Sequence, residues 1–147
     1  PYGSRRAGPI DTLLCTQDIL PTTLGLAGIP APPELPGIDL SPCLYTSPAT
    51  ALPEPDSCYL QHTRHKRLED GLNLPWRGVV THDGWKYVCI PNAPYGMWNL
   101  NEDPYELANL VFNQRFMPQR AKLHARLARW IEETGDPFDL PDLQPLL

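Results

Sequence analysis

The densest group of side chains able to bind an anion lies between positions 61 and 67, which read Gln-His-Thr-Arg-His-Lys-Arg. Arginine, lysine and protonated histidine donate charge-assisted hydrogen bonds to acidic groups. Such a run could contact an anionic or sugar-bearing ligand. A mixed basic run is more often a solvated surface loop, and we favour that interpretation.

Arg77 is a second candidate for anion binding, because it lies in a short run with the residue types of a β-strand. From a strand, its planar guanidinium can donate two parallel hydrogen bonds to a bound oxyanion. The alternative is an ion pair with a carboxylate at an interface between domains.

Metal binding would need ligands that this sequence does not space correctly. Cys58, His62 and His65 lie near one another, but their spacing is not that of a recognised zinc site and no fourth ligand is close. The other cysteines are Cys15, Cys43 and Cys89, and no two of the four form a Cys-x-x-Cys pair. Two disulfides are allowed by the even number, but buried free thiols are the simpler expectation.

Aromatic side chains offer a third chemistry, because a flat ring can stack on a sugar. Trp76, Trp85, Tyr87 and Trp98 are the candidates. Aromatic residues at alternating strand positions more often pack in a core, so we expect these four to be core residues.

The elements that must position these groups begin with a β-hairpin. Two runs rich in β-branched and aromatic residues, 76–81 and 85–88, flank Asp83-Gly84, which predicts a hairpin with a type I′ turn. Val80, Tyr87 and Cys89 are candidates for its buried face. A third strand is expected at 97–100.

Two helices are predicted after the third strand. Asp103, Pro104 and Glu106 fit the first turn of a capped helix. From 116 to 134, apolar residues recur every three or four positions, interrupted only at Arg120, and Gly135 follows them. This spacing predicts a long amphipathic helix packed on the sheet.

The first part of the chain has a different character. Residues 18–27 predict a short helix that ends at Gly28. Eight of the 19 prolines lie between positions 30 and 55, which favours an extended strap. Ser57 to His62 could form an edge strand. The predicted fold class is therefore α+β, with a small antiparallel sheet of three or four strands packed against one long C-terminal helix.

Composition excludes some function classes. The chain of 147 residues is 41% hydrophobic and 20% charged, as in ordinary globular domains of a size that can bury a core. A net charge of −5 argues against nucleic acid as a partner. No apolar run is long enough to span a bilayer, so we expect no membrane span.

The ordered motifs resemble the C-terminal part of the sulfatase family, the formylglycine-dependent hydrolases of sulfate esters. They are Trp-Arg-Gly-Val at 76–79, a Lys-Tyr strand at 85–88, Trp-Asn-Leu at 98–100, Asn-Glu-Asp-Pro-Tyr-Glu-Leu-x-Asn-Leu at 101–110 and the terminal helix. Residues 17–28 resemble a helix near the end of the large sulfatase domain. The resemblance implies that residues 1–52 end the large α/β domain and that 53–147 form the C-terminal subdomain.

The resemblance also implies where the chemistry lies. The family nucleophile is a formylglycine made from the first residue of a Cys/Ser-x-Pro/Ala-x-Arg motif, and no cysteine or serine here begins one. The paired acidic residues that hold calcium in the family have no counterpart either. We therefore expect no catalytic residue, cofactor or metal in this segment, and expect the calcium and formylglycine in an N-terminal catalytic domain of the same parent chain.

The predicted role of the segment is to pack on that catalytic domain and to line the cleft for a sulfate-ester substrate. In relatives the loop before the Trp-Arg-Gly strand approaches the cleft, which makes Gln61, His62, His65 and Arg77 the cleft candidates. Two alternatives stay open. One is a stand-alone binding module that resembles a sulfatase tail, and the other is the tail of a related phosphonate or phosphate ester hydrolase.

Overall fold

A computed structural model describes residues 10–44, 55–63 and 74–143 of the chain. The chain divides into two units, Pro1–Cys58 and Tyr59–Leu147, which we name the helical unit and the sheet unit. This division falls inside the first strand, close to the domain boundary expected between 52 and 53. Whether that boundary separates two domains of a larger protein stays a prediction.

The elements follow one another along the chain as short 3₁₀ turns (η), helices (α) and strands (β). They are η1 (Thr16–Asp18), α1 (Ile19–Ala27), η2 (Ser41–Leu44), β1 (Ser57–His62), β2 (Trp76–Thr81), β3 (Trp85–Ile90), β4 (Ala93–Asn99), η3 (Gln114–Phe116) and α2 (Met117–Thr134).

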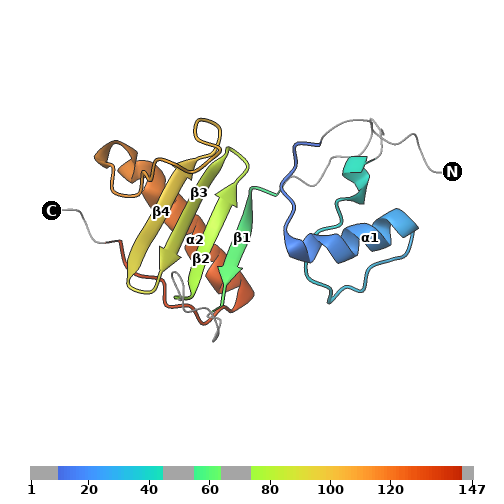
Figure 1. Cartoon of the computed structure of the whole chain (residues 1–147). Coiled ribbons are helices and arrows are strands. Elements are labelled where there is room, and N and C mark those ends of the chain that lie inside the picture. Colours follow the sequence, from blue (N-terminus) through green and yellow to red (C-terminus); the bar gives the residue numbers. More distant parts are fainter. Residues whose placement is uncertain (1–9, 45–54, 64–73, 144–147) are drawn as a thin grey trace. The chain divides into compact units, whose positions relative to one another are not determined.

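The four strands form one sheet in the order β1-β2-β3-β4, with α2 lying across one face (Figure 1). The β2–β3 and β3–β4 pairs are antiparallel, and Val79 lies opposite Tyr87, which lies opposite Met97. These three side chains face α2 and are fully buried. The α+β class, the antiparallel sheet and the long terminal helix are therefore confirmed, as is the edge position of residues 57–62.

The core between sheet and helix is built from alternate strand residues and the apolar stripe of α2. Its fully or nearly fully buried members are Val79, Tyr87, Cys89, Met97, Val111, Leu123 and Leu127. The prediction for Val80 was wrong by one position, because Val80 pairs with Lys86 and lies on the opposite face from Val79. A shift of one residue along a strand moves a side chain to the other face.

The hairpin forms where expected, but its turn is not type I′. Only Gly84 has a positive φ, of 82°, and the Gly84 N–H donates to the Thr81 carbonyl at 2.9 Å. Three residues connect the strands, as in a type I turn followed by a glycine in the left-handed region. The side chain of Asn101 lies against Gly84 and donates to the Asp83 carbonyl at 3.0 Å, so a larger residue at Gly84 would collide with it.

Residues 101–110 form no helix, contrary to the prediction. The Asp103 carboxylate instead accepts the N–H of Ala108 at 2.8 Å, and Glu106 has a φ of 57°, which interrupts helical geometry. Backbone hydrogen bonds, led by that from Ala108, lower the pKa of Asp103. The carboxylate therefore organises a loop, and the loop directs Glu106 toward β3.

The terminal helix α2 ends as predicted. Gly135 has a φ of 61° and caps the helix, and the Asp136 N–H donates to the Ile131 carbonyl at 3.0 Å. This left-handed cap reverses the chain and delivers Asp136 to the sheet. Arg120, which interrupts the apolar stripe, is buried and donates from Nη1 to the Val111 carbonyl at 3.2 Å.

In the helical unit, Asp18 connects α1 to the segment that follows it. Its carboxylate accepts the N–H of Cys15 at 2.7 Å and the N–H of Ile38 at 2.8 Å. Pro21 is the third residue of α1, where its missing N–H costs no helical hydrogen bond, and Gly28 ends the helix with a φ of 71°. Between 30 and 44 the chain forms turns and the short η2, and 45–54 lie outside the described residues.

Candidate functional site

The strongest polar cluster of the sheet unit joins β1, β2 and the residue that follows the cap of α2. Arg77 donates to Asp136 twice, from Nε at 2.7 Å and from Nη2 at 3.1 Å. The same carboxylate accepts Tyr59 Oη at 3.1 Å, Gln61 Nε2 at 2.7 Å and the Phe138 N–H at 2.9 Å. We name these residues the Asp136 cluster.

Arg77 and Asp136 are both buried, with side chains 9% and 4% exposed. Burial opposes ionisation of Asp136, but the hydrogen bonds from Arg77 and Phe138 outweigh it and hold the pKa of Asp136 below its usual value. Arg77 Nη1 donates to the carbonyls of His62 and Trp76, both at 3.0 Å. This arrangement holds the sheet to the end of α2.

The cleft candidates from the sequence occupy different positions. Gln61 and Arg77 converge on Asp136, and His62 stacks on Trp76 with ring centroids 5.7 Å apart. His65 lies outside the described residues. Sequence reasoning missed Asp136, although Gly135 directly before it signals the left-handed end of the helix.

A groove lies on the face of the sheet opposite α2. It has a volume of about 280 Å³ and is lined by Trp76, Lys86, Val88, Ile90, Tyr95, Trp98 and Glu106. We name it the sheet groove. Trp76 and Trp98 are thus not in the core between sheet and helix, contrary to the expectation, whereas Tyr87 and Trp85 pack there as predicted.

One ion pair lies in the sheet groove. Lys86 Nζ is 2.8 Å from both carboxylate oxygens of Glu106 and lies over the Trp98 ring, 5.5 Å from its centroid. Because Glu106 comes from the loop and Lys86 from β3, twenty positions apart, no local spacing in the sequence could predict this pair.

A buried cysteine and a half-buried histidine also lie close together at the core. The Cys89 thiol donates to Tyr87 Oη at 3.1 Å, and this oxygen lies 3.0 Å from His124 Nδ1. Burial raises the pKa of the Cys89 thiol to about 11 and lowers the pKa of His124. A thiol that is buried and protonated is not a nucleophile, so this cluster serves packing.

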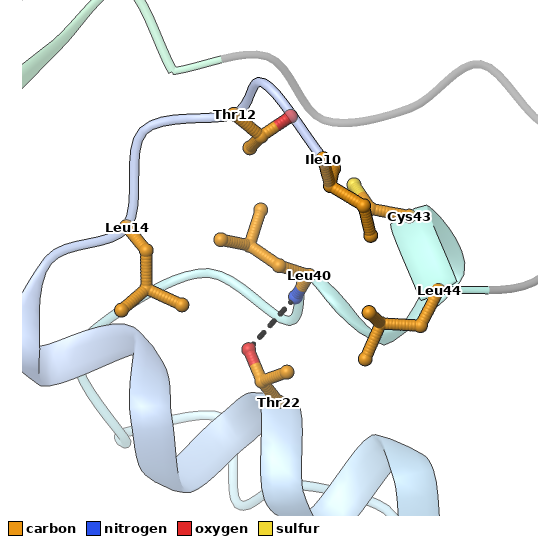
Figure 2. A pocket seen from close by; sticks show the side chains of 7 residues that line it. All are labelled: Ile10, Thr12, Leu14, Thr22, Leu40, Cys43 and Leu44. Atoms are coloured by element: carbon orange, nitrogen blue, oxygen red, sulfur yellow. Dashed lines mark hydrogen bonds between the residues drawn. The ribbon is translucent and has the colours of Figure 1, made fainter. Parts of the chain in front are cut away.

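The helical unit contains a second cavity, of about 230 Å³. Figure 2 shows seven side chains around it, with the dashed hydrogen bond from the Leu40 N–H to Thr22 Oγ1, at 3.0 Å. The lining is otherwise mostly apolar: Ile10, Thr12, Leu14, Leu40, Cys43 and Leu44. Without a charged group, this cavity suits an apolar side chain better than a polar ligand.

Neither a metal site nor a membrane span is evident among the residues described. Within 10–44, 55–63 and 74–143, no three histidine, cysteine or acidic side chains come together to hold a metal ion. None of the helices in these ranges is long and apolar enough to cross a membrane. No disulfide joins the four cysteines, all of which lie in the described ranges, and Cys43, Cys58 and Cys89 are buried.

Comparison of the sequence with curated proteins gives two relatives. The chain is 31% identical over 140 residues to the uncharacterised sulfatase YidJ of Escherichia coli K12 and 32% identical over 127 residues to an ulvan-active sulfatase of Formosa agariphila. These matches cover 94% and 86% of this chain. The chain is related to the sulfatases. It spans about a quarter of the length of both relatives, 26% and 24%, and fits the C-terminal portion of the family.

Solved structures agree on the fold. A 2-O GAG sulfatase, 27% identical, matches with a TM-score of 0.74 over 89% of this chain and 28% of its own. A protein solved in complex with its substrate D-glucosamine-2-N,6-O-disulfate has a TM-score of 0.68 at 22% identity, covering 86% and 25% of the two chains. A phosphonate monoester hydrolase of Agrobacterium radiobacter scores 0.56 at 20% identity, covering 79% and 24%. No family model matches the chain.

Proposed function

We propose that this chain is the C-terminal part of a sulfatase that hydrolyses sulfate esters. The observation that carries the proposal is the coverage of the sequence matches. Similarity extends over 94% of this chain but only 26% of the relative YidJ, and it includes both the helical unit and the sheet unit. Such coverage is expected of one segment of a larger enzyme, and the motifs at 76–110 favour its C-terminal part.

The reacting groups would then come from the remainder of the parent chain. None of the four cysteines begins a Cys/Ser-x-Pro/Ala-x-Arg motif, and the described residues bring no metal-binding group together. The residues present therefore do not fit the calcium or the formylglycine of the family, and we place both in the N-terminal catalytic domain.

The helical unit supplies the surface that meets that domain. It exposes large apolar side chains and has the apolar cavity shown in Figure 2. The exposed side chains are Leu14, Ile19, Leu20, Ile29 and Ile38. A set of exposed apolar residues of this size marks a surface that another part of the protein covers. The charge-free lining of the cavity suits an aliphatic side chain of the catalytic domain.

The sheet unit would line the substrate cleft from the strand end that carries Gln61 and His62, and His65 follows them in the sequence. Arg77 is buried and would position both residues: it shares the Asp136 carboxylate with Gln61 and donates to the His62 carbonyl. The GAG and ulvan named for two relatives suggest that the sulfate ester is carried by a sugar. A phosphonate or phosphate ester is the second candidate substrate, because the phosphonate monoester hydrolase shares the fold.

Sulfate release from an aryl sulfate tests this proposal. The 147-residue chain alone, with calcium added, is expected to give no turnover, whereas the full chain encoded by its gene should release sulfate. An aryl phosphonate monoester assayed in parallel separates the two substrate classes.

The control is the full chain with the first residue of its Cys/Ser-x-Pro/Ala-x-Arg motif replaced by alanine, which should be inactive. Calcium-dependent turnover by a pure preparation of the 147-residue chain would show that catalytic groups lie in this segment and would contradict the proposal.

A further inference from the structure

We propose that the sheet groove binds one neutral sugar ring of a glycan, separate from the sugar that carries the reacting sulfate. The choice of a sugar as ligand rests on the proposed function. The position and chemistry of the site rest on the geometry of the groove.

The walls of the groove are suited to a sugar ring. Trp76 comes from β2, Tyr95 and Trp98 come from β4, and Val88 and Ile90 form the apolar floor between them. Flat aromatic faces pack against the C–H faces of a pyranose, as they pack against other flat apolar groups. A volume of about 280 Å³ is near the lower end of roughly 300–1,000 Å³ for small-molecule sites, which suits one ring.

The polar groups of the groove can bind hydroxyls. The Lys86 ammonium has three N–H groups and contacts only the two carboxylate oxygens of Glu106 among the hydrogen-bond partners described, both at 2.8 Å. One donor and several carboxylate lone pairs therefore remain, a combination that fits two neighbouring hydroxyls.

The charge of the groove selects against sulfate. Lys86 and Glu106 cancel each other, and a carboxylate at this position repels an anion. A hydroxyl both donates and accepts, so it can bind the pair without separating it. The groove is therefore a site for an uncharged part of the glycan, unlike the basic run at 61–67.

Glu106 is held in place before any ligand arrives. Its φ of 57° is unusual for a residue with a side chain, and the Asp103–Ala108 hydrogen bond fixes the loop around it. A sparsely populated backbone conformation that aims a side chain into a groove is typical of a binding site. Preorganisation of this kind reduces the entropy lost when a ligand binds.

Titration of the full chain with desulfated tetrasaccharides tests the site, with tryptophan fluorescence and calorimetry as readouts. The probes are tetrasaccharides prepared from heparin, chondroitin sulfate and ulvan, made neutral by desulfation, acetylation of free amines and reduction of the uronic acids to neutral sugars. We expect saturable binding of at least one probe, little changed by added salt because the ligand is neutral. Tyr95→Ala should weaken this binding about fivefold through the loss of one aromatic wall. Glu106→Gln should weaken it about tenfold.

The matched control is Tyr105→Ala. Tyr105 is 82% exposed on the same loop and does not line the groove, so its removal should leave binding unchanged. The proposal is overturned if no probe binds, or if Tyr95→Ala and Tyr105→Ala bind equally well. Sulfate release by the same preparation keeps the two proposals distinct. If the enzyme releases sulfate but binds no probe, the proposed function stands and the proposed sugar site in the sheet groove is rejected.

Discussion

Replacement of Arg77 by leucine is expected to lower the free energy of unfolding of the sheet unit by about 3–5 kcal/mol. The leucine leaves the Asp136 carboxylate, whose side chain is 4% exposed, without the guanidinium that holds it at 2.7 and 3.1 Å. It also removes the hydrogen bonds that Arg77 donates to the carbonyls of His62 and Trp76. Urea unfolding followed by tryptophan fluorescence measures the loss.

Two further variants test whether the loss of stability comes from the broken ion pair or from the removal of any arginine. Adding Asp136→Asn to the Arg77→Leu variant should recover part of the stability, because the uncompensated charge is removed. Arg129→Leu, on the exposed side of α2, should change stability by no more than about 0.5 kcal/mol. Equal effects of the substitutions at 77 and 129 would contradict the account of the cluster.

The pH dependence gives an independent check on the same pair. The pKa of Asp136 is lower in the folded chain than in the unfolded chain, so its contribution is present at neutral pH. This contribution is lost as the pH falls through the folded pKa, below about pH 4. The Asp136→Asn variant should lack this part of the acid dependence.

Replacement of Leu127 by alanine is expected to lower the free energy of unfolding by about 2–5 kcal/mol. Leu127 is fully buried among Val79, Tyr87 and Met97, at the interface of α2 with the sheet. Removing the Cγ methine and its two methyl groups there leaves a cavity that a well-packed sheet cannot close. The same urea titration measures the loss of unfolding free energy.

Leu107→Ala is the matched control, because the chemical change is identical and Leu107 is 85% exposed on the loop. Its expected effect is within about 0.5 kcal/mol. A comparable loss from both substitutions would mean that α2 is not the element that closes the core.

Local patterns in the sequence predict much of this fold. The spacing of apolar residues gives α2 within one residue of its observed start, and Gly135 marks its end. The hairpin follows from two strand-like runs around Asp83-Gly84. These signals are readable because each is set by neighbours three or four positions apart, or by alternation along a strand.

The groups that build the candidate sites depend on distant pairs. Arg77 and Asp136 are 59 positions apart, and Lys86 and Glu106 are 20 apart. The prediction of a helix at Asp103 failed in part for the same reason. Its capping residues fit a local rule, but the Asp103 carboxylate accepts the Ala108 N–H, five positions on, and the Glu106 carboxylate pairs with Lys86 on β3, 20 positions back. No pattern in a single sequence records such pairs.

The measurement that tests the central claim most directly is the DNA sequence upstream of the Pro1 codon, read in frame. If this chain is the C-terminal part of a sulfatase, the frame continues upstream for several hundred codons. It then encodes a Cys/Ser-x-Pro/Ala-x-Arg motif and the paired acidic residues that hold calcium. A stop codon shortly before Pro1, with no such motif, would contradict the claim and make a stand-alone binding module the better account.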